Sequence, residues 1–327
     1  MADGAVTRAR VVAAFAAIYV IWGSTYLAIL FAIETLPPFL MAGARFLIAG
    51  AVVYAWARAR GAAKPDLGHW KAATIIGGLL LLGGNGGVVW AEQHVPSGLA
   101  ALLVAMVPLW MVTMEWARSG ERPARGVIAG LAIGMSGLAL LVGPGEFAGG
   151  VGPKPIGVLV LVVASLSWAA GSIYARGVRL PSSPFLTTGM QMLAGGALLV
   201  VAGLLAGEPA QADLGAATAK SWLALLYLVV FGSLIGYTAY IWLLKVSTPA
   251  KVATYAYVNP VVAVMLGWAF AGETLSLRTL LAAAVIIAGV AMITITRSGR
   301  RPPSITRSPT EPPRDAGALP ADRRRIA

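Results

Sequence analysis

The chain has 327 residues, of which 58% are hydrophobic and only 12% charged, and its mean hydropathy is +0.79. No soluble globular domain approaches these values, so they exclude a water-soluble protein and indicate an integral membrane protein. The formal net charge of +12 would suit nucleic-acid binding, but the positions of the basic residues argue against that reading, as shown below.

Ten segments are long and apolar enough to cross a bilayer as helices, since about 20 residues rising 1.5 Å each cover roughly 30 Å of hydrocarbon. In chain order they are residues 11–32, 37–57, 70–90, 97–117, 125–143, 155–175, 185–206, 220–244, 250–271 and 278–296. None shows the alternating pattern of a membrane β-barrel. The first segment lacks a clear signal-peptide cleavage site, so we expect it to be a retained span. The sequence therefore predicts an all-α integral membrane fold with ten transmembrane helices.

The basic residues predict the orientation of the spans. Of the 25 Lys and Arg residues, 21 fall on one face, whereas Lys154, Lys220 and Arg278 fall on the other and Arg45 lies inside a span. Because basic loops stay in the cytoplasm, both termini should be cytoplasmic. The net charge is thus mostly a topology signal, and we expect no nucleic-acid partner. Residues 298–327, rich in Arg and Pro, should form a disordered cytoplasmic tail that touches anionic lipid.

The two halves of the chain repeat each other. At a shift of 146 residues, Trp22 aligns with Trp168, and the matched positions continue through Pro38, Gly43 and Gly50 with Pro184, Gly189 and Gly196. At a shift of 152 residues, the matched pairs include Trp70 with Trp222, Gly84 with Gly236, Pro108 with Pro260 and Glu121 with Glu273. Shared apolar composition does not explain matched Trp and Pro. We expect a first repeat at 10–145 and a second at 154–297.

Each repeat contains five spans, which is an odd number, so the second must enter the membrane from the opposite side. The sequence therefore predicts two inverted five-helix repeats. Halves related by an axis in the membrane plane present equivalent surfaces to the two compartments, which suits alternating access to a site between them.

Several polar or helix-breaking residues fall near the middle of the spans. Trp22 and Trp168 place indole N–H groups where no headgroup can bond them, so these residues either line a polar cavity or serve ordinary helix packing. Pro108 and Pro260 each leave a carbonyl without its helical donor, which predicts a matched pair of hinges, with simple packing kinks as the alternative. We expect one central space lined by Trp22, Asn85, Trp168, Tyr237, Tyr255 and Asn259.

Two of the polar residues in the spans allow more than one interpretation. Arg45 lies about 12 Å below the outer boundary of its span, where an unpaired arginine costs roughly 3 kcal/mol, so it should reach water, a carbonyl or an anion. It either bonds backbone carbonyls or receives a substrate carboxylate, a planar match that lysine would not reproduce. Asn85, set among four glycines in LLGGNGGVVW, serves either close helix packing or a binding site.

The acidic residues give little sign of catalysis. We expect Glu121 and Glu273 to complement the helix dipoles of the spans that follow them, and Glu115 to reach water at a span end, with proton carriage as the less favoured role. The chain has no cysteine and no phosphate-binding G-x-x-x-x-G-K-[ST] motif, and its two histidines lie at span ends on opposite sides. The sequence therefore predicts no enzyme, no cofactor and no metal site.

Four stretches carry a family resemblance: IYVIWGSTYLAI, LPPFLMAGARFLIAG, VPSGLAALLVAMVPLW and TYAYVNPVVAVMLGWAFAGETLS. Together they resemble the EamA-type family of the drug/metabolite transporter superfamily, and within it the bacterial inner-membrane exporters of the YedA type. This resemblance implies a secondary transporter in the cytoplasmic membrane that exports small metabolites, such as amino acids, or amphiphilic drugs. It implies a small-molecule substrate, contact with lipid and a monomer or weak homodimer. The alternative is a non-transporting scaffold or sensor with the same fold.

Overall fold

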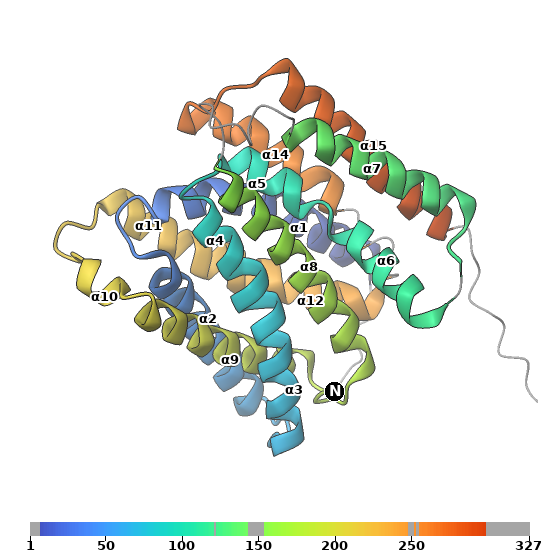
Figure 1. The fold of residues 1–327 in the computed structure, drawn as a ribbon. Helices are drawn as coiled ribbons and strands as arrows, with labels where there is room; N and C mark the ends of the chain where they lie inside the picture. The colour runs from blue at the N-terminus through green and yellow to red at the C-terminus, as the bar shows by residue number, and fades with distance from the viewer. Residues whose placement is uncertain (1–6, 121, 143–153, 248–251, 253–254, 299–327) are drawn as a thin grey trace, which may run out of the picture.

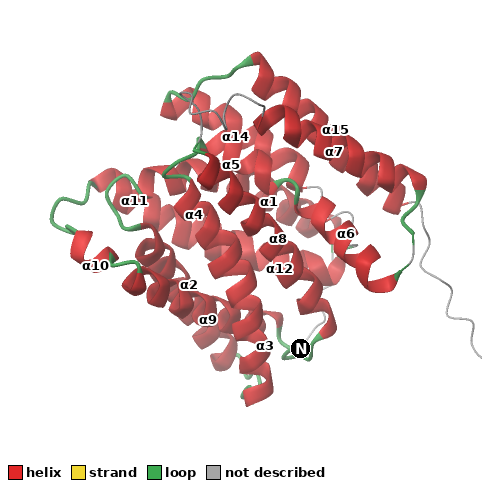
Figure 2. Cartoon of the chain, in the orientation of Figure 1, coloured by secondary structure: helices red, strands yellow, loops and turns green. Residues whose placement is uncertain are grey.

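The computed structural model describes residues 7–120, 122–142, 154–247, 252 and 255–298. Within these residues every regular element is a helix and no strand occurs (Figure 2). Seven helical runs are at least 18 residues long and apolar enough to cross a membrane, and three shorter apolar helices lie at 125–137, 258–271 and 277–293. Each of the ten expected segments is helical over most of its described residues. Residues 299–327 of the expected tail lie outside the described part.

The first half of the chain begins with two long helices and continues with two interrupted ones. Its elements are α1 (Arg8–Ala32), α2 (Pro38–Ala59), α3 (Leu67–Gly77), η1 (Gly78–Gly86), α4 (Gly87–Ala91), α5 (Ser97–Val104), α6 (Val107–Ser119) and α7 (Arg125–Val142). Here α3, η1 and α4 run on as one span, and α5 and α6 together form the next. Some helix starts carry capping side chains; the Asp66 carboxylate, for example, accepts the His69 N–H (2.7 Å) at the start of α3.

The second half follows the same order. Its elements are α8 (Pro155–Gly177), α9 (Pro184–Leu205), α10 (Glu208–Gln211), α11 (Ala219–Tyr227), η3 (Leu228–Tyr237), α12 (Thr238–Val246), α14 (Tyr255–Ala271) and α15 (Leu277–Ser298). The third long helical run of this half is composed of α11, η3 and α12, as the third run of the first half is composed of α3, η1 and α4. Both runs therefore carry a π-helical stretch in their middle, an irregularity that often marks functional sites.

The two prolines expected to act as matched hinges differ in their surroundings. Pro108 is the second residue of α6, directly after the turn at 105–106 that separates α6 from α5. Pro260 lies inside α14, which continues without a break from Tyr255 to Ala271. The expected interruption is therefore present at Pro108 and absent at Pro260 within the described residues.

Two helix pairs form the flanks of the molecule, α2 with α9 and α7 with α15, and each pair lies side by side in Figure 1. In the first pair, a Cβ atom at Gly43 would lie 3.1 Å from the Gly196 carbonyl oxygen, and one at Gly50 would lie 3.1 Å from that of Gly189. Such approaches need glycine on both helices. Residue numbers rise along α2 while those of the contacts fall along α9, so the two helices are antiparallel.

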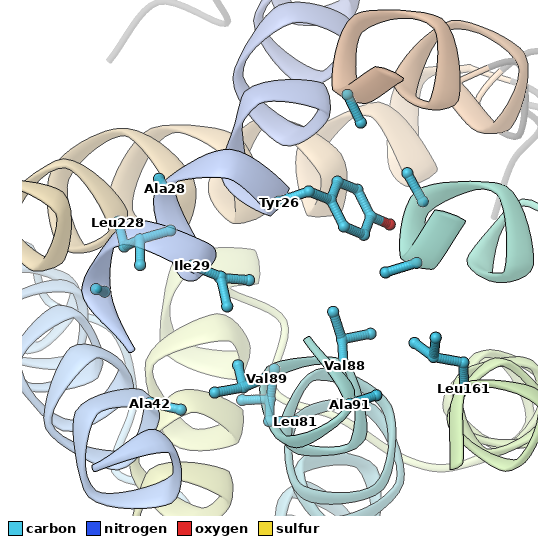
Figure 3. Close-up of a cluster of buried hydrophobic side chains, with 14 of the residues drawn as sticks. Tyr26, Ala28, Ile29, Ala42, Leu81, Val88, Val89, Ala91, Leu161 and Leu228 are labelled. Carbon is cyan, nitrogen blue, oxygen red and sulfur yellow. The ribbon is translucent and has the colours of Figure 1, made fainter. Parts of the chain in front are cut away.

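Apolar side chains occur both on the outer surface and in the interior, as expected in a membrane protein. Large apolar side chains such as Val20, Leu159 and Phe270 are more than half exposed, which suits contact with lipid tails rather than water. The largest buried cluster lies at the centre, where Ile29 on α1 meets Leu81 on η1 and Val89 on α4 (Figure 3). The helices around this cluster also position the cavity described next.

Candidate functional site

A cavity of about 80 Å³ lies where α1, α2, η1, α8, η3 and α14 meet. Its lining contains all seven residues that the sequence predicts for substrate binding: Trp22, Arg45, Asn85, Trp168, Tyr237, Tyr255 and Asn259. These residues come from both halves of the chain. The geometry brings them together, while their role in binding stays a prediction. The lining also includes Tyr26, Phe46 and Gly232, which the sequence analysis did not single out.

Arg45 is the charged group of this cavity, and its side chain is only 3% exposed. Its Nε donates to the Ser233 hydroxyl (2.7 Å), and its guanidinium carbon lies 4.7 Å from the centre of the Phe46 ring. One terminal nitrogen, Nη1, is buried without a hydrogen-bond partner, and no carboxylate among the described residues pairs with the guanidinium. The cavity wall therefore carries a positively charged guanidinium with an unused hydrogen-bond donor.

Arg45 can approach η3 closely because residue 232 is glycine. A Cβ atom at Gly232 would lie 2.8 Å from the Arg45 Nη2, so any side chain there would displace the guanidinium. The glycine at position 232 of η3 is therefore required for this approach of Arg45. The sequence predicted that Arg45 would bond either backbone carbonyls or an anion, and its one donor contact given by the structure goes instead to a side-chain hydroxyl.

Two amides lie beside the same space. The Asn85 Oδ1 is buried without a hydrogen-bond partner. With its nitrogen directed toward α1, the Asn259 amide donates to the carbonyl oxygens of Tyr19 (3.1 Å) and Tyr255 (3.2 Å), which ties α14 to α1. Asn85 therefore offers the cavity an unused acceptor, whereas the Asn259 nitrogen is already satisfied by the protein.

Aromatic rings form much of the wall. Trp22 and Trp168 meet edge to face with ring centres 6.1 Å apart, and Trp22 also meets Tyr255 edge to face at 5.3 Å. The Trp22 indole N–H donates to the Gly232 carbonyl (3.2 Å), and the Tyr237 hydroxyl donates to the Gln191 side-chain oxygen (2.8 Å). Their polar ends are thus held by the protein, which leaves ring faces and edges for an apolar part of a ligand.

Glycines bring these two tryptophans against the π-helical stretches in the same way. A Cβ atom at Gly84 would lie 2.8 Å from Cε3 of Trp168, and one at Gly236 would lie 2.6 Å from Nε1 of Trp22. Gly84 and Gly236 occupy matching positions in the two repeats, as do Trp22 and Trp168. A glycine of each half therefore contacts the tryptophan of the other half in the same way.

A larger space of about 430 Å³ adjoins the cavity, and we call it the vestibule. Trp168 and Tyr255 line both spaces, so they stand between them. Most of the other vestibule residues come from α6, the end of α8, α9 and α12, among them Pro108, Arg176, Pro184 and Tyr240. The vestibule thus lies toward the N-terminal face, the one at which α1 begins and α6 and α8 end. At this face Arg176 pairs with Glu115 (2.7 Å), an ion pair that the sequence did not predict.

At the opposite face, where α1 ends and α2 and α5 begin, carboxylates bind helix starts, and we call it the closed face. Glu273 accepts the Ser97 N–H (2.7 Å), the Ser97 hydroxyl (2.6 Å) and the Gly98 N–H (3.1 Å) at the start of α5. The sequence assigned Glu273 to the dipole of the span that follows it, and this was wrong, because the chain folds back onto α5 of the other repeat. Its counterpart Glu121 lies outside the described residues.

One acidic residue of this closed face was missed by the sequence analysis. Glu92 follows α4 directly, its side chain is only 3% exposed, and neither carboxylate oxygen has a hydrogen-bond partner. Burial, and to a smaller degree the nearby charge of Glu273, hold the pKa of Glu92 well above its usual range. In the sequence, Glu92 comes one residue after an apolar run, where an acid is ordinarily a solvated loop residue.

Comparison with known proteins agrees with this architecture. The model of the EamA-like transporter family matches twice, at residues 10–143 and 155–295. The chain is 42% identical over 281 residues to the "Uncharacterized inner membrane transporter YedA" of Escherichia coli K12, covering 85% of this chain and 89% of that protein. It is 25% identical over 295 residues to the "Uncharacterized transporter YvbV" of Bacillus subtilis, covering 88% and 92% of the two chains.

A solved crystal structure, 24% identical in sequence, superposes with a TM-score of 0.60 and covers 89% of this chain and 99% of its own, which supports the fold alone. The family match spans both halves of the chain, and the relative at 42% identity spans most of it. The chain is therefore a multi-pass membrane protein and belongs to the EamA-like transporter family.

Proposed function

We propose that this protein is a secondary transporter of the bacterial cytoplasmic membrane that exports small solutes carrying a carboxylate, with amino acids as the leading class. Membership of the EamA-like transporter family and the inner-membrane location in the name of the Escherichia coli relative support transport across that membrane. Amphiphilic drugs are the second solute class that the aromatic wall suits. The observation that carries the carboxylate is the buried, unpaired Arg45.

The contacts between the halves support two inverted five-helix repeats. Positions Gly43 and Gly50 correspond to Gly189 and Gly196, and the structure joins Gly43 to Gly196 and Gly50 to Gly189. Such crossed pairing is what a two-fold axis produces. Because α2 and α9 are counterparts and antiparallel, that axis is perpendicular to them and lies in the plane of the membrane. The seven long helical runs and three shorter apolar helices would then form ten spans.

Alternating access follows from this symmetry. The vestibule gives the central cavity a wide approach from the N-terminal face, while Glu273 and Glu208 bind helix starts together at the opposite face. If both termini are cytoplasmic, as the distribution of basic residues predicts, the structure represents a state open toward the cytoplasm. Exchange of the roles of the two repeats would open the other face.

The polar groups of the cavity support the choice of solute. A carboxylate can take two parallel hydrogen bonds from a guanidinium, and Arg45, which lines the cavity, has an unpartnered Nη1. The unpartnered Asn85 Oδ1 can accept from an ammonium or amide donor of the same solute. An unsatisfied buried donor costs about 1–3 kcal/mol, which a bound solute would recover. The 80 Å³ cavity is small, so a bulky side chain would extend past Trp168 into the vestibule.

The experiment is efflux from liposomes that contain the purified protein. The interior is loaded with a panel of labelled amino acids, matched amino-acid amides and amphiphilic amines, and release is followed with time. We expect protein-dependent release of amino acids above that of their amides. Release of no solute in the panel above protein-free liposomes would favour a scaffold or sensor, and release of amines alone would contradict the role given to Arg45.

A further inference from the structure

Glu92 is a buried acid that the proposed solute site does not use. It stands where α4 ends, at the closed face, and the loop after it leads to Ser97 at the start of α5. Ala91 and Val88, on the helix that leads to Glu92, pack in the same cluster as Tyr26 of α1 (Figure 3). Glu92 therefore belongs to the part of the molecule that must separate if this face opens.

An ionised carboxylate in this place would be without compensation. Both Glu92 oxygens are inaccessible to solvent and accept no hydrogen bond, and Glu92 forms no ion pair in the described part of the chain. An isolated buried charge is so costly that a carboxyl group in such a site takes up a proton instead. A protonated carboxyl has no charge to neutralise, so it tolerates an apolar environment far better.

The neighbouring charge adds to this argument. Glu273 has donors for both its oxygens, from Ser97 and Gly98 at the start of α5. Glu92 is close enough to feel its charge, which disfavours a second negative charge. The two acids thus have different surroundings: Glu273 is hydrogen-bonded to a helix start, whereas Glu92 has no hydrogen-bond partner.

No cation in the described part of the chain bonds the Glu92 carboxyl. The titratable or charged groups on neighbouring elements include Tyr26 on α1, Arg45 on α2, Glu273 after α14, Lys154 before α8, Arg278 at the start of α15 and His94 in the same loop. The Lys154 side chain is exposed and its contact with this loop is a backbone bond to the His94 carbonyl (3.2 Å). Arg45 donates to Ser233 in the central cavity. None of these groups bonds the Glu92 carboxyl.

We propose that Glu92 is a proton-binding site that couples the closed face to pH, holding a proton while this face is closed and releasing it to water when the face opens. The opening step rests on the proposed alternating access, whereas the bound proton does not. Tyr26 lines the central cavity and lies within electrostatic reach of Glu92, so it connects the proton site to the proposed solute site. A proton bound or released with each opening would couple solute movement to a proton gradient.

The direction of the pH effect follows from linkage. The closed state binds the proton and an open, hydrated Glu92 has an ordinary pKa of about 4.3, so the closed state is favoured fully below that pH. Above it, each pH unit favours opening by about tenfold, until the pH passes the raised pKa of the closed state. Higher pH at this face therefore promotes its opening.

Infrared spectroscopy of the protein in liposomes tests the bound proton without any transport assay. We expect the carbonyl stretch of a protonated carboxyl group at pH 7.0, which is about 2.7 units above an ordinary Glu pKa. The band should vanish in Glu92→Gln and persist in Glu34→Gln, the matched control, whose carboxylate at the same face is exposed and pairs with Lys220. Absence of the band from the unaltered protein would overturn the proposal, and this result does not depend on whether Glu92→Gln folds. A band that survives in folded Glu92→Gln would overturn it as well.

Thiol labelling in this cysteine-free chain tests the opening. Val95→Cys places a thiol at a buried position of the closed face, and Leu214→Cys places one at an exposed position of the same face. The ratio of their labelling rates by a membrane-impermeant reagent removes the pH dependence of the thiol itself. This ratio should rise with pH, and Glu92→Gln should keep it low at every pH. If the labelling ratio depends on pH in Glu92→Gln as it does in the unaltered protein, coupling between Glu92 and opening is refuted. If the infrared and labelling results are as expected but no solute efflux is found, only the proposed solute export is contradicted.

Discussion

Trp22 and Trp168 contact each other edge to face, with ring centres 6.1 Å apart and an interplanar angle of 89°. They are also counterparts, because a shift of 146 residues carries one onto the other. A residue that touches its own counterpart must lie close to the axis that relates the two halves. The tryptophan pair therefore marks the centre of the molecule, and the solute cavity lies around it.

The glycines beneath these rings should tolerate no side chain. In Gly84→Ala and Gly236→Ala the new Cβ atom would lie 2.8 Å and 2.6 Å from the tryptophan it faces. Overpacking of this kind costs typically about 1–3 kcal/mol, so both variants should lower the free energy of unfolding and reduce efflux. Thermal unfolding in detergent checks this. Gly177→Ala, at the end of α8 with no atom within 4 Å, should behave like the unaltered protein, and equal loss in all three would contradict the packing argument.

The break in the fourth span should matter more than the proline in the ninth. Pro108→Ala supplies an N–H that can bond the Val104 carbonyl and join α5 to α6, whereas Pro260→Ala changes a helix that is already continuous. We expect Pro108→Ala to slow efflux by several-fold while leaving the protein at least as stable, and Pro260→Ala to have a smaller effect. Efflux rates at matched protein content measure this difference. Equal slowing in both variants would count against a hinge at Pro108.

The Glu208 carboxylate should stabilise the start of α2. It accepts the N–H groups of Phe39 (2.9 Å) and Leu40 (2.8 Å) and is 7% exposed. Hydrogen bonds to charged groups contribute about 1.5–3 kcal/mol, so Glu208→Ala should lower the free energy of unfolding by about that amount. The exposed Glu34 at the same face provides the control, since Glu34→Ala removes only a surface ion pair with Lys220. Chemical unfolding in detergent compares the two, and equal effects would refute the claim.

The cap at the start of α3 should give a second pH dependence, at the N-terminal face. The backbone N–H of His69 bonds the Asp66 carboxylate and lowers its pKa. A carboxyl group with a lowered folded-state pKa stabilises the fold above its unfolded pKa of about 3.9, and the effect is lost as pH falls through the lower folded value. Asp66→Ala should therefore lower the melting temperature at pH 7, and the gap should close in acid. Asp66→Asn, which keeps a cap, should show a smaller loss.

Much of the cavity could be predicted from the sequence because polarity inside a membrane is costly. Arg45, Asn85 and Asn259 are expensive against lipid, and Trp22 and Trp168 carry N–H groups, so an inward position was the physically cheaper choice for each. The same reasoning located the helical segments, since length and hydropathy suffice for that. That the side chains bind a solute is a further prediction, and only flux measurements test it.

Other features depended on tertiary contacts that leave little trace in the sequence. The π-helical stretches η1 and η3 arise from a local change of hydrogen-bond register, which composition does not determine. Glu273 was assigned to the wrong helix because its partners, Ser97 and Gly98, belong to the other repeat. Glu92 was overlooked because an acid just past a span usually reaches water, and its burial depends on the tertiary packing around the end of α4.

The central claim is that the Arg45 guanidinium receives the carboxylate of the transported solute. Efflux of one amino acid and of its amide, compared between the unaltered protein and Arg45→Lys, tests this most directly. Arg60→Lys, an exposed change at the end of the same helix, is the control. The account predicts normal membrane abundance for Arg45→Lys, loss of acid efflux by at least about tenfold, which corresponds to 1.4 kcal/mol, and little change for the amide and for Arg60→Lys. Undiminished acid efflux by Arg45→Lys at normal abundance would contradict it.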